Sequence, residues 1–110
     1  MTLQAAADDA RLALACLDLT SLNDVDDDAA IDALCRRAVT PWGAVAAVCV
    51  WPRFVTRARR ALPSAVKVAA VANFPAGALD AALAVDDARA IVDAGGDEVD
   101  LVLPWRAMLG

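Results

Sequence analysis

The 110-residue sequence contains no histidine, and its only lysine is Lys67. Without histidine the chain lacks the usual general base, the Ser-His and Cys-His nucleophile pairs, and the commonest ligand of zinc and iron sites. It also lacks a G-x-G-x-x-G or Walker-type loop, so no motif indicates a bound nucleotide. We therefore expect no metal site and no cofactor.

Long apolar runs are also missing, and none approaches the roughly 18 to 20 residues that cross a bilayer. Residues 1–16 carry Asp8, Asp9 and Arg11 inside a helical pattern, which does not suit a signal peptide. The formal net charge of −5 argues against a nucleic-acid surface. We expect neither membrane nor nucleic acid as a partner.

The cysteines are odd in number and show no C-x-x-C spacing. This usage indicates reduced thiols in a cytoplasmic protein. The three residues are Cys16, Cys35 and Cys49. At this length we expect a single domain over residues 1–110, just large enough to bury its own core.

Hydrophobic periodicity predicts one helix, then three strand–helix pairs, then a last strand. The expected strands cover residues 17–22, 45–51, 66–72 and 97–103, and the longest helices cover 2–16 and 78–94. Because the connections are short and the strands mostly apolar, right-handed βα units in a parallel sheet are expected. A flavodoxin-like open sheet and part of a TIM barrel both fit this α/β pattern.

An acidic run at residues 24–28 precedes the second predicted helix, and Arg36 and Arg37 close it. Acids at a helix N-terminus and bases at its C-terminus suit the helix dipole. We interpret the run as helix chemistry and not as a metal site.

The last predicted strand carries two carboxylates, Glu98 and Asp100, two residues apart. Strand alternation places both acids on one face and the aliphatic residues Val99, Leu101 and Leu103 on the other. A buried carboxylate is costly unless it is paired, so acids in such a strand are candidates for function. The alternative is that Glu98 lies in solvent at the strand start while Asp100 makes a structural hydrogen bond.

Four motifs resemble the deoxyribose-phosphate aldolases, a family of class I aldolases with a TIM-barrel fold. They occur in the order and spacing of that family and span nearly the whole chain. The motifs are Leu17-Asp18-Leu19-Thr20-Ser21-Leu22-Asn23, Cys49-Val50-Trp51-Pro52-Arg53-Phe54, Asn73-Phe74-Pro75-Ala76-Gly77 and Gly96-Asp97-Glu98-Val99-Asp100-Leu101-Val102.

The resemblance implies a lyase of deoxyribose phosphate catabolism, which reversibly cleaves 2-deoxyribose 5-phosphate to glyceraldehyde 3-phosphate and acetaldehyde. In that family one lysine forms a Schiff base, a second lysine tunes it, and an aspartate transfers protons. Asp100 matches the catalytic aspartate. Asp18, Thr20, Asn23 and Cys49 match residues that line the substrate site.

A complete TIM barrel needs about 250 residues, so this chain resembles the N-terminal half of one. The lysines and the phosphate-binding loops of the family belong to the other half. Lys67 lies at the start of its predicted strand, whereas active sites lie at the C-terminal ends, to which Asp100, Cys49 and Asn73 point. We therefore assign no Schiff-base lysine and expect the chain alone to be inactive.

Two hypotheses follow. In the first, the chain supplies Asp100 and the site lining, and a complementary C-terminal half completes the aldolase. In the second, it is a structural half-barrel without catalysis, whose open strand edges and uncovered face lead to a homo-oligomer.

Overall fold

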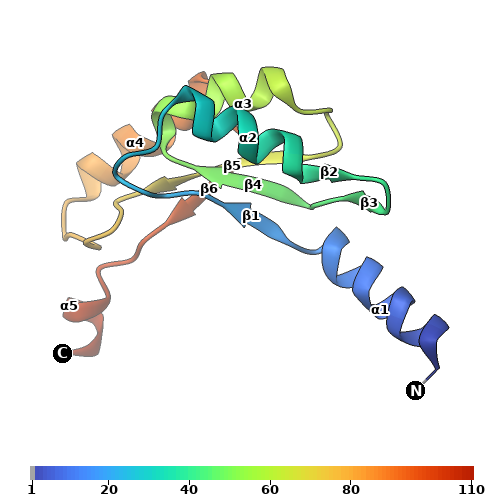
Figure 1. Cartoon of the computed structure of the whole chain (residues 1–110). Helices are drawn as coiled ribbons and strands as arrows, with labels where there is room; N and C mark the ends of the chain where they lie inside the picture. Colours follow the sequence, from blue (N-terminus) through green and yellow to red (C-terminus); the bar gives the residue numbers. More distant parts are fainter. Residues whose placement is uncertain (1) are drawn as a thin grey trace.

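The structure is a computed structural model that describes residues 2–110; Met1, which falls in the expected 1–110 domain, lies outside the described residues. The chain runs through alternating helices and strands (Figure 1). The helices are α1 (Leu3–Ala15), α2 (Asp28–Ala38), the 3-10 turn η1 (Pro52–Phe54), α3 (Val55–Ala61), α4 (Ala81–Asp93) and α5 (Trp105–Leu109). The strands are β1 (Asp18–Thr20), β2 (Val39–Thr40), β3 (Gly43–Ala44), β4 (Ala47–Val50), β5 (Lys67–Ala72) and β6 (Glu98–Leu101).

Four parallel strands form the main sheet in the order β1-β4-β5-β6, as the α/β prediction required. Each strand pairs with the next one in the chain apart from the short β2–β3 hairpin, which forms a separate antiparallel pair. A flavodoxin-like sheet reverses its strand order and carries helices on both faces. The sequential order therefore decides between the two architectures, and the fold is part of a TIM barrel.

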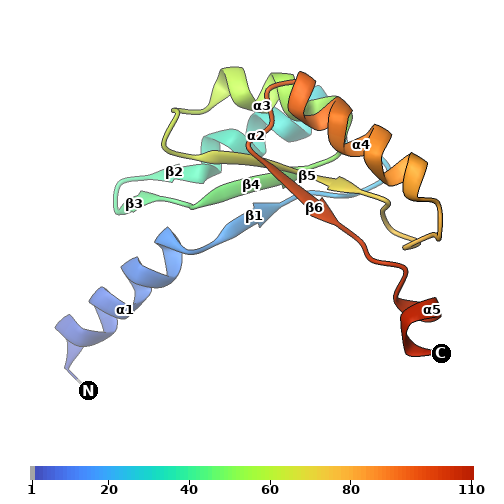
Figure 2. The same cartoon turned by 180° about the vertical axis from the view of Figure 1, so that it is seen from behind.

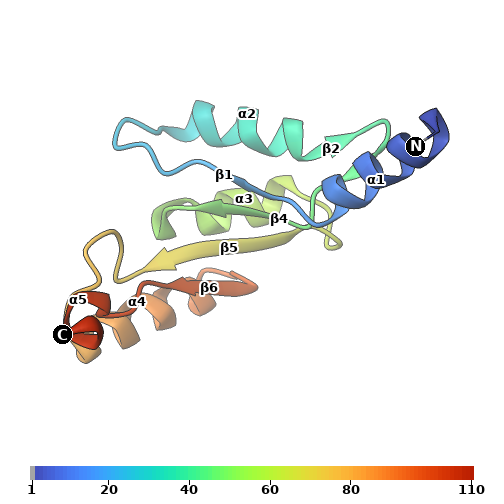
Figure 3. The same cartoon turned by 90° about the horizontal axis from the view of Figure 1, so that it is seen from below.

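Helices α2, α3 and α4 all lie on one face of the sheet, and the view from behind shows the same layering (Figures 1 and 2). Seen from below, α3 and α4 lie behind the strands and α2 lies alongside β1, while α1 and α5 lie at opposite ends (Figure 3). All four residues of β4 are buried, as the apolar run of residues 45–51 indicates, although helices α2, α3 and α4 pack against one face of the sheet only.

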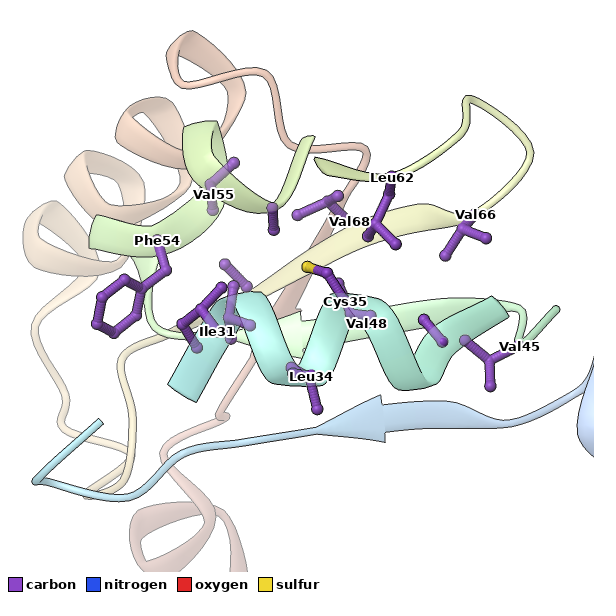
Figure 4. Close-up of a cluster of buried hydrophobic side chains, with 14 of the residues drawn as sticks. Ile31, Leu34, Cys35, Val45, Val48, Phe54, Val55, Leu62, Val66 and Val68 are labelled. Atoms are coloured by element: carbon purple, nitrogen blue, oxygen red, sulfur yellow. The ribbon is translucent and has the colours of Figure 1, made fainter. Parts of the chain in front are cut away.

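The core lies between the sheet and these helices (Figure 4). Ile31 of α2 and Val55 of α3 are fully buried there against Val48 and Val68 of the central strands, and Ile91 of α4 closes one end. Burial of such side chains stabilises a fold by about 1.5 to 3 kcal/mol each. This layer holds the central strands in place.

Side-chain caps explain where the helices begin. The Asp27 side chain accepts a hydrogen bond from the Ala30 amide, and Arg36 and Arg37 occupy the last turn of α2, so the helix interpretation of the acidic run is confirmed. Asp80 caps α4 in the same way, which starts this helix three residues later than the periodicity predicted.

Several local predictions need correction. The chain makes the short β2–β3 hairpin at residues 39–44, which the predicted strands did not include. The first helix is present as predicted, but α1, which the structure describes in full, buries none of its side chains. The last strand ends at Leu101 and not at residue 103, because the chain turns away toward α5.

No helix within residues 2–110 combines the length and the apolar character that crossing a bilayer requires.

Candidate functional site

The predicted site residues of three strands lie on the sheet face opposite to the helices. Parallel register places Thr20 beside Cys49, and Cys49 beside Ala69, which in turn lies beside Glu98. Residues that are neighbours in this register point to the same face. Cys49 belongs to a small cluster apart from the main core, whereas its neighbours in sequence, Val48 and Val50, pack under the helices.

We call this surface the open face. It consists of the strand side chains that alternate with those of the main core: Asp18, Thr20, Ala47, Cys49, Lys67, Ala69, Val71, Glu98 and Asp100. Its four small residues from β4 and β5 are buried, and the polar residues around them are exposed. The open face is therefore a floor of small side chains with carboxylates on both edge strands.

Asp100 lies in the row nearest the C-terminal ends of the strands, where its partner in β5 is Val71. The alternation predicted for the last strand is confirmed, since Val99 and Leu101 pair with the core residues Ala70 and Ala72. All four residues of β6 are exposed, because β6 has a neighbouring strand on one side only. Glu98 therefore lies in solvent at the strand start, as the alternative interpretation expected.

Lys67 belongs to the opposite end of the open face. It shares a row with Ala47 and Asp18, four residues before Val71 along β5. At about 3.3 Å per strand residue, this separates Lys67 from the level of Asp100 by about 13 Å. Lys67 lies at the N-terminal end of its strand, as the sequence predicted.

Cys49 is 3% exposed at the centre of the open face. Burial raises its pKa to about 11, and the negative charges of Asp100, Asp18 and Glu98 act in the same direction. The thiol is therefore protonated at neutral pH. A protonated thiol is a poor nucleophile, so Cys49 suits the lining of a site and not covalent chemistry.

Asn23 lies in the loop after β1, at the C-terminal side of the sheet. Its side-chain amide donates to Asp26 Oδ1 at 3.3 Å and to Ser21 Oγ at 3.4 Å, and its backbone carbonyl oxygen accepts a 3.1 Å bond from Trp51 Nε1. The Ser21 hydroxyl, which donates to Asp26 Oδ2 at 2.7 Å, is the main cause that lowers the pKa of Asp26. An ionised Asp26 thus organises the loop that carries Asn23.

Trp51 joins two loops at this rim, a role that the sequence did not single out. In addition to its bond to Asn23, its ring meets the ring of Phe74 edge-on, with centroids 5.4 Å apart. Both residues belong to the quoted family motifs, and an aromatic residue directly after a buried strand was the available signal.

Asn73 directly follows β5 and joins three segments by hydrogen bonds. Its Nδ2 atom donates to the carbonyl oxygens of Ala78 at 2.9 Å and Val102 at 3.0 Å, and its backbone amide donates to the Asp87 carboxylate at 2.9 Å. Its φ of 55° is left-handed, a conformation that asparagine tolerates better than most residues. Asn73 thereby fixes the chain two residues after Asp100.

Gly77 closes the same loop at a φ of +64°, and a Cβ atom there would lie 2.5 Å from the Leu103 carbonyl oxygen. Only glycine allows this close approach of the β5–α4 loop to the end of β6. The two loops at the C-terminal ends of β5 and β6 are consequently packed together.

No group of three or more metal-ligating side chains comes together within the described part of the chain. The structure brings Asp18, Thr20, Cys49 and Asp100 onto one face, and it leaves Asn23 on the adjacent rim, where its amide already bonds within its own loop.

Comparisons with known proteins agree with this architecture. A family model described as DeoC/LacD family aldolase matches residues 12–109. The solved structure of a protein assigned as a deoxyribose-phosphate aldolase from Coccidioides immitis is 32% identical, with a TM-score of 0.74, over 83% of this chain and 35% of its own.

Two further solved structures show the same fold at lower identity. One, assigned as a deoxyribose-phosphate aldolase from Toxoplasma gondii, is 23% identical, with a TM-score of 0.82, over 96% of this chain and 40% of its own. The other, the deoxyribose phosphate aldolase from Aeropyrum pernix, is described as a tetramer and is 21% identical, with a TM-score of 0.74, over 88% of this chain and 41% of its own. The chain thus spans well under half the length of these solved proteins.

Proposed function

Because the chain belongs to the DeoC/LacD aldolase family, we propose that residues 1–110 form one half-barrel domain that supplies half of an aldolase active site. A C-terminal half supplies the lysine that forms the Schiff base. The assembled site reversibly cleaves 2-deoxyribose 5-phosphate to glyceraldehyde 3-phosphate and acetaldehyde. The half-barrel alone carries no lysine at the level of Asp100 and is inactive.

The observation that carries this proposal is the position of Asp100 on the open face. The carboxylate lies at the C-terminal side of the sheet, where the active sites of TIM barrels lie. It is exposed, and within residues 2–110 it makes no side-chain hydrogen bond or ion pair. A carboxylate in this position can hold or transfer a proton next to a substrate carbon bound to the other half.

The remaining open-face residues suit a polar substrate. Thr20 of β1 offers a hydroxyl for sugar hydroxyl groups, and the protonated Cys49 thiol forms a neutral floor between Thr20 and Asp100. Asp18 stands two residues earlier on β1, in the row of Lys67. The loop of Asn23 borders the same side, held by Trp51. The family resemblance implies that Asp18, Thr20, Asn23 and Cys49 line the substrate site.

The test is the release of acetaldehyde, followed through its reduction by alcohol dehydrogenase and NADH. The chain is co-expressed with the C-terminal half of the Coccidioides immitis relative, and the co-purified pair is compared with the chain alone. We expect activity from the pair and none from the chain. An assembled pair that releases no acetaldehyde would contradict the proposal.

Asp100→Asn distinguishes a chemical role from a structural one. Positioned proton transfer contributes about 100-fold or more to a rate, so the variant pair should assemble normally and lose activity to that extent. Asp93→Asn is the matched control, because Asp93 is an exposed aspartate at the end of α4, away from the open face. Equal activities of the two variant pairs would remove Asp100 from the mechanism.

A second candidate function is a self-assembling half-barrel without catalysis. It is favoured by the two edge strands, since β1 and β6 each pair with one neighbour and present a free edge. Open strand edges tend to pair with a strand of another chain, and identical chains commonly form closed symmetric oligomers in this way. Light scattering distinguishes the two candidates, because a self-assembling half-barrel has the mass of an oligomer in solution, whereas a half-barrel that needs a C-terminal half has the mass of a monomer.

A further inference from the structure

The C-terminal end of β6 is held by a side chain of the neighbouring segment. The regular pairing of β6 with β5 ends at Leu101. Val102 follows, and both of its backbone groups are bonded: its amide donates to the Ala72 carbonyl oxygen at 3.0 Å, and its carbonyl oxygen accepts a 3.0 Å bond from Asn73 Nδ2. The side-chain amide of Asn73 thus extends the hydrogen bonding between the two strands beyond the end of the sheet.

Asn73 is itself held firmly. Its backbone amide donates to the Asp87 carboxylate of α4 at 2.9 Å, and its backbone carbonyl oxygen accepts a 3.0 Å bond from the Gly77 amide. The other bond from Nδ2 goes to the Ala78 carbonyl oxygen at 2.9 Å. The side chain is buried, so water has little access to these bonds. Asn73 is therefore a fixed support for the end of β6.

This support lies close to Asp100. Asp100 is the last residue but one of β6 and precedes Val102 by two residues, about 7 Å along the strand. Strand ends are the first parts of a sheet to open, so the loss of the bond to the Val102 carbonyl oxygen would loosen β6 from this end. A displacement of about 1 Å at a reacting group can cost about 100-fold in rate. The position of the Asp100 carboxylate thus depends on Asn73.

We propose that Asn73 is a positioning residue for the aldolase reaction. By holding the Val102 carbonyl oxygen, it fixes the point on β6 from which Asp100 transfers a proton. Asn73 does not bind the substrate, because both bonds from its Nδ2 atom go to backbone carbonyl oxygens of its own chain. The positioning role rests on the proposed function, since it requires that Asp100 takes part in the chemistry.

The first test uses the assembled pair of the chain with the C-terminal half of the Coccidioides immitis relative. Asn73→Gly removes both side-chain hydrogen bonds, and glycine adopts the left-handed φ of 55° without strain. We expect kcat for 2-deoxyribose 5-phosphate to fall by about tenfold to 100-fold. KM should change by less than about twofold, because the side chains offered to the substrate are unchanged. A higher KM at unchanged kcat would overturn the proposal.

The double variant Asn73→Gly/Asp100→Asn shows whether Asn73 acts through Asp100. Once the carboxylate is absent, its position no longer matters, so the double variant should be as active as Asp100→Asn alone. A purely structural effect of Asn73 would lower the activity of both backgrounds by the same factor. Multiplied losses would therefore overturn the positioning role.

Ile91→Ala controls for a general loss of stability. Ile91 is fully buried in the core beside Gly96, before the opposite end of β6, and its truncation leaves a cavity. At a temperature where both variant pairs are folded and assembled, the control should keep kcat within about twofold of wild type. An equal loss of kcat in the control would show that stability and not position is responsible.

Asn73→Asp is measured at pH 8 as a second variant, so that a glycine variant that fails to assemble leaves the proposal open to test. Aspartate fills the same space and tolerates a left-handed φ, but an ionised carboxylate cannot donate to a carbonyl oxygen. We expect the same loss of kcat as in Asn73→Gly. Wild-type activity of Asn73→Asp would contradict the proposal.

Amide exchange in the chain alone tests the structural part without the reaction. In Asn73→Gly the Val102 amide should exchange about tenfold faster or more relative to the Asp97 amide, which bonds to Val68 at the start of β6. Equal changes at both amides would overturn the local effect on Asp100. An inactive wild-type pair would refute the proposed function and the positioning role together, whereas an active pair with multiplied losses would refute the positioning role only.

Discussion

Replacing Asn73 by alanine should destabilise the chain more than the same replacement of Asn23, the only other asparagine of the sequence. The side chain is 7% exposed, and its Nδ2 atom donates the two hydrogen bonds that join the β5–α4 loop to the end of β6. Losing each bond costs about 1 kcal/mol, and forcing alanine into the left-handed φ of 55° costs about 1 kcal/mol more. We therefore expect Asn73→Ala to lower the free energy of unfolding by about 3 kcal/mol.

Urea unfolding followed by circular dichroism measures this loss, with the slope m checked for constancy. Asn23→Ala is the matched control, because Asn23 is exposed and its side-chain bonds of 3.3 and 3.4 Å are long; it should cost about 0.5 kcal/mol or less. Asn73→Gly separates the two contributions, since glycine adopts the same φ freely.

Glycine loses the hydrogen bonds but removes the strain, at an entropic cost of its own, so Asn73→Gly should be more stable than Asn73→Ala by about 0.5 kcal/mol. Hydrogen exchange gives a local measure, because the Val102 amide, which donates to the Ala72 carbonyl oxygen, should lose protection in both variants. If Asn73→Ala were no less stable than Asn23→Ala, the argument that Asn73 holds β6 in place would be refuted.

Three further predictions concern the core, the pH dependence and the thiols. Ile31→Ala should cost about 2 to 5 kcal/mol in urea unfolding, since Ile31 is fully buried between α2 and the sheet; a loss below 1 kcal/mol would show that the core relaxes around the gap. The hydrogen bond from the Val68 amide and the charge of Arg59 hold the pKa of Asp97 below its usual value. The stability due to Asp97 is therefore complete above about pH 5 and is lost as the pH falls through the lowered pKa, so Asp97→Asn should flatten the acid limb of the stability curve, and an unchanged limb would contradict this. In the folded chain a thiol reagent at pH 8 should modify the exposed Cys16 first, because Cys49 is buried with a pKa of about 11; equally fast labelling of both, followed by mass spectrometry, would contradict the described burial.

The sequence by itself determined the types of the main elements and the faces of the strands. The alternation of Glu98 and Asp100 with Val99 and Leu101 was readable because side chains in a strand point to opposite faces in turn, which is a local property. The acids before α2 were likewise recognisable, since capping and dipole interactions act within one helical turn. The family resemblance was also present in short local motifs.

Only the tertiary structure decided the order of the strands and the side of the helices. Periodicity admitted an open sheet covered on both faces, and the sequential pairing of β1, β4, β5 and β6 excluded it. Pairing between strands depends on contacts between residues far apart in the chain, and no local pattern encodes these. The clamp from Asn73 to the carbonyl oxygen of Val102, which spans 29 residues, was not predictable for the same reason. The open face likewise exists because register places Asp18, Thr20, Cys49 and Asp100 on one surface.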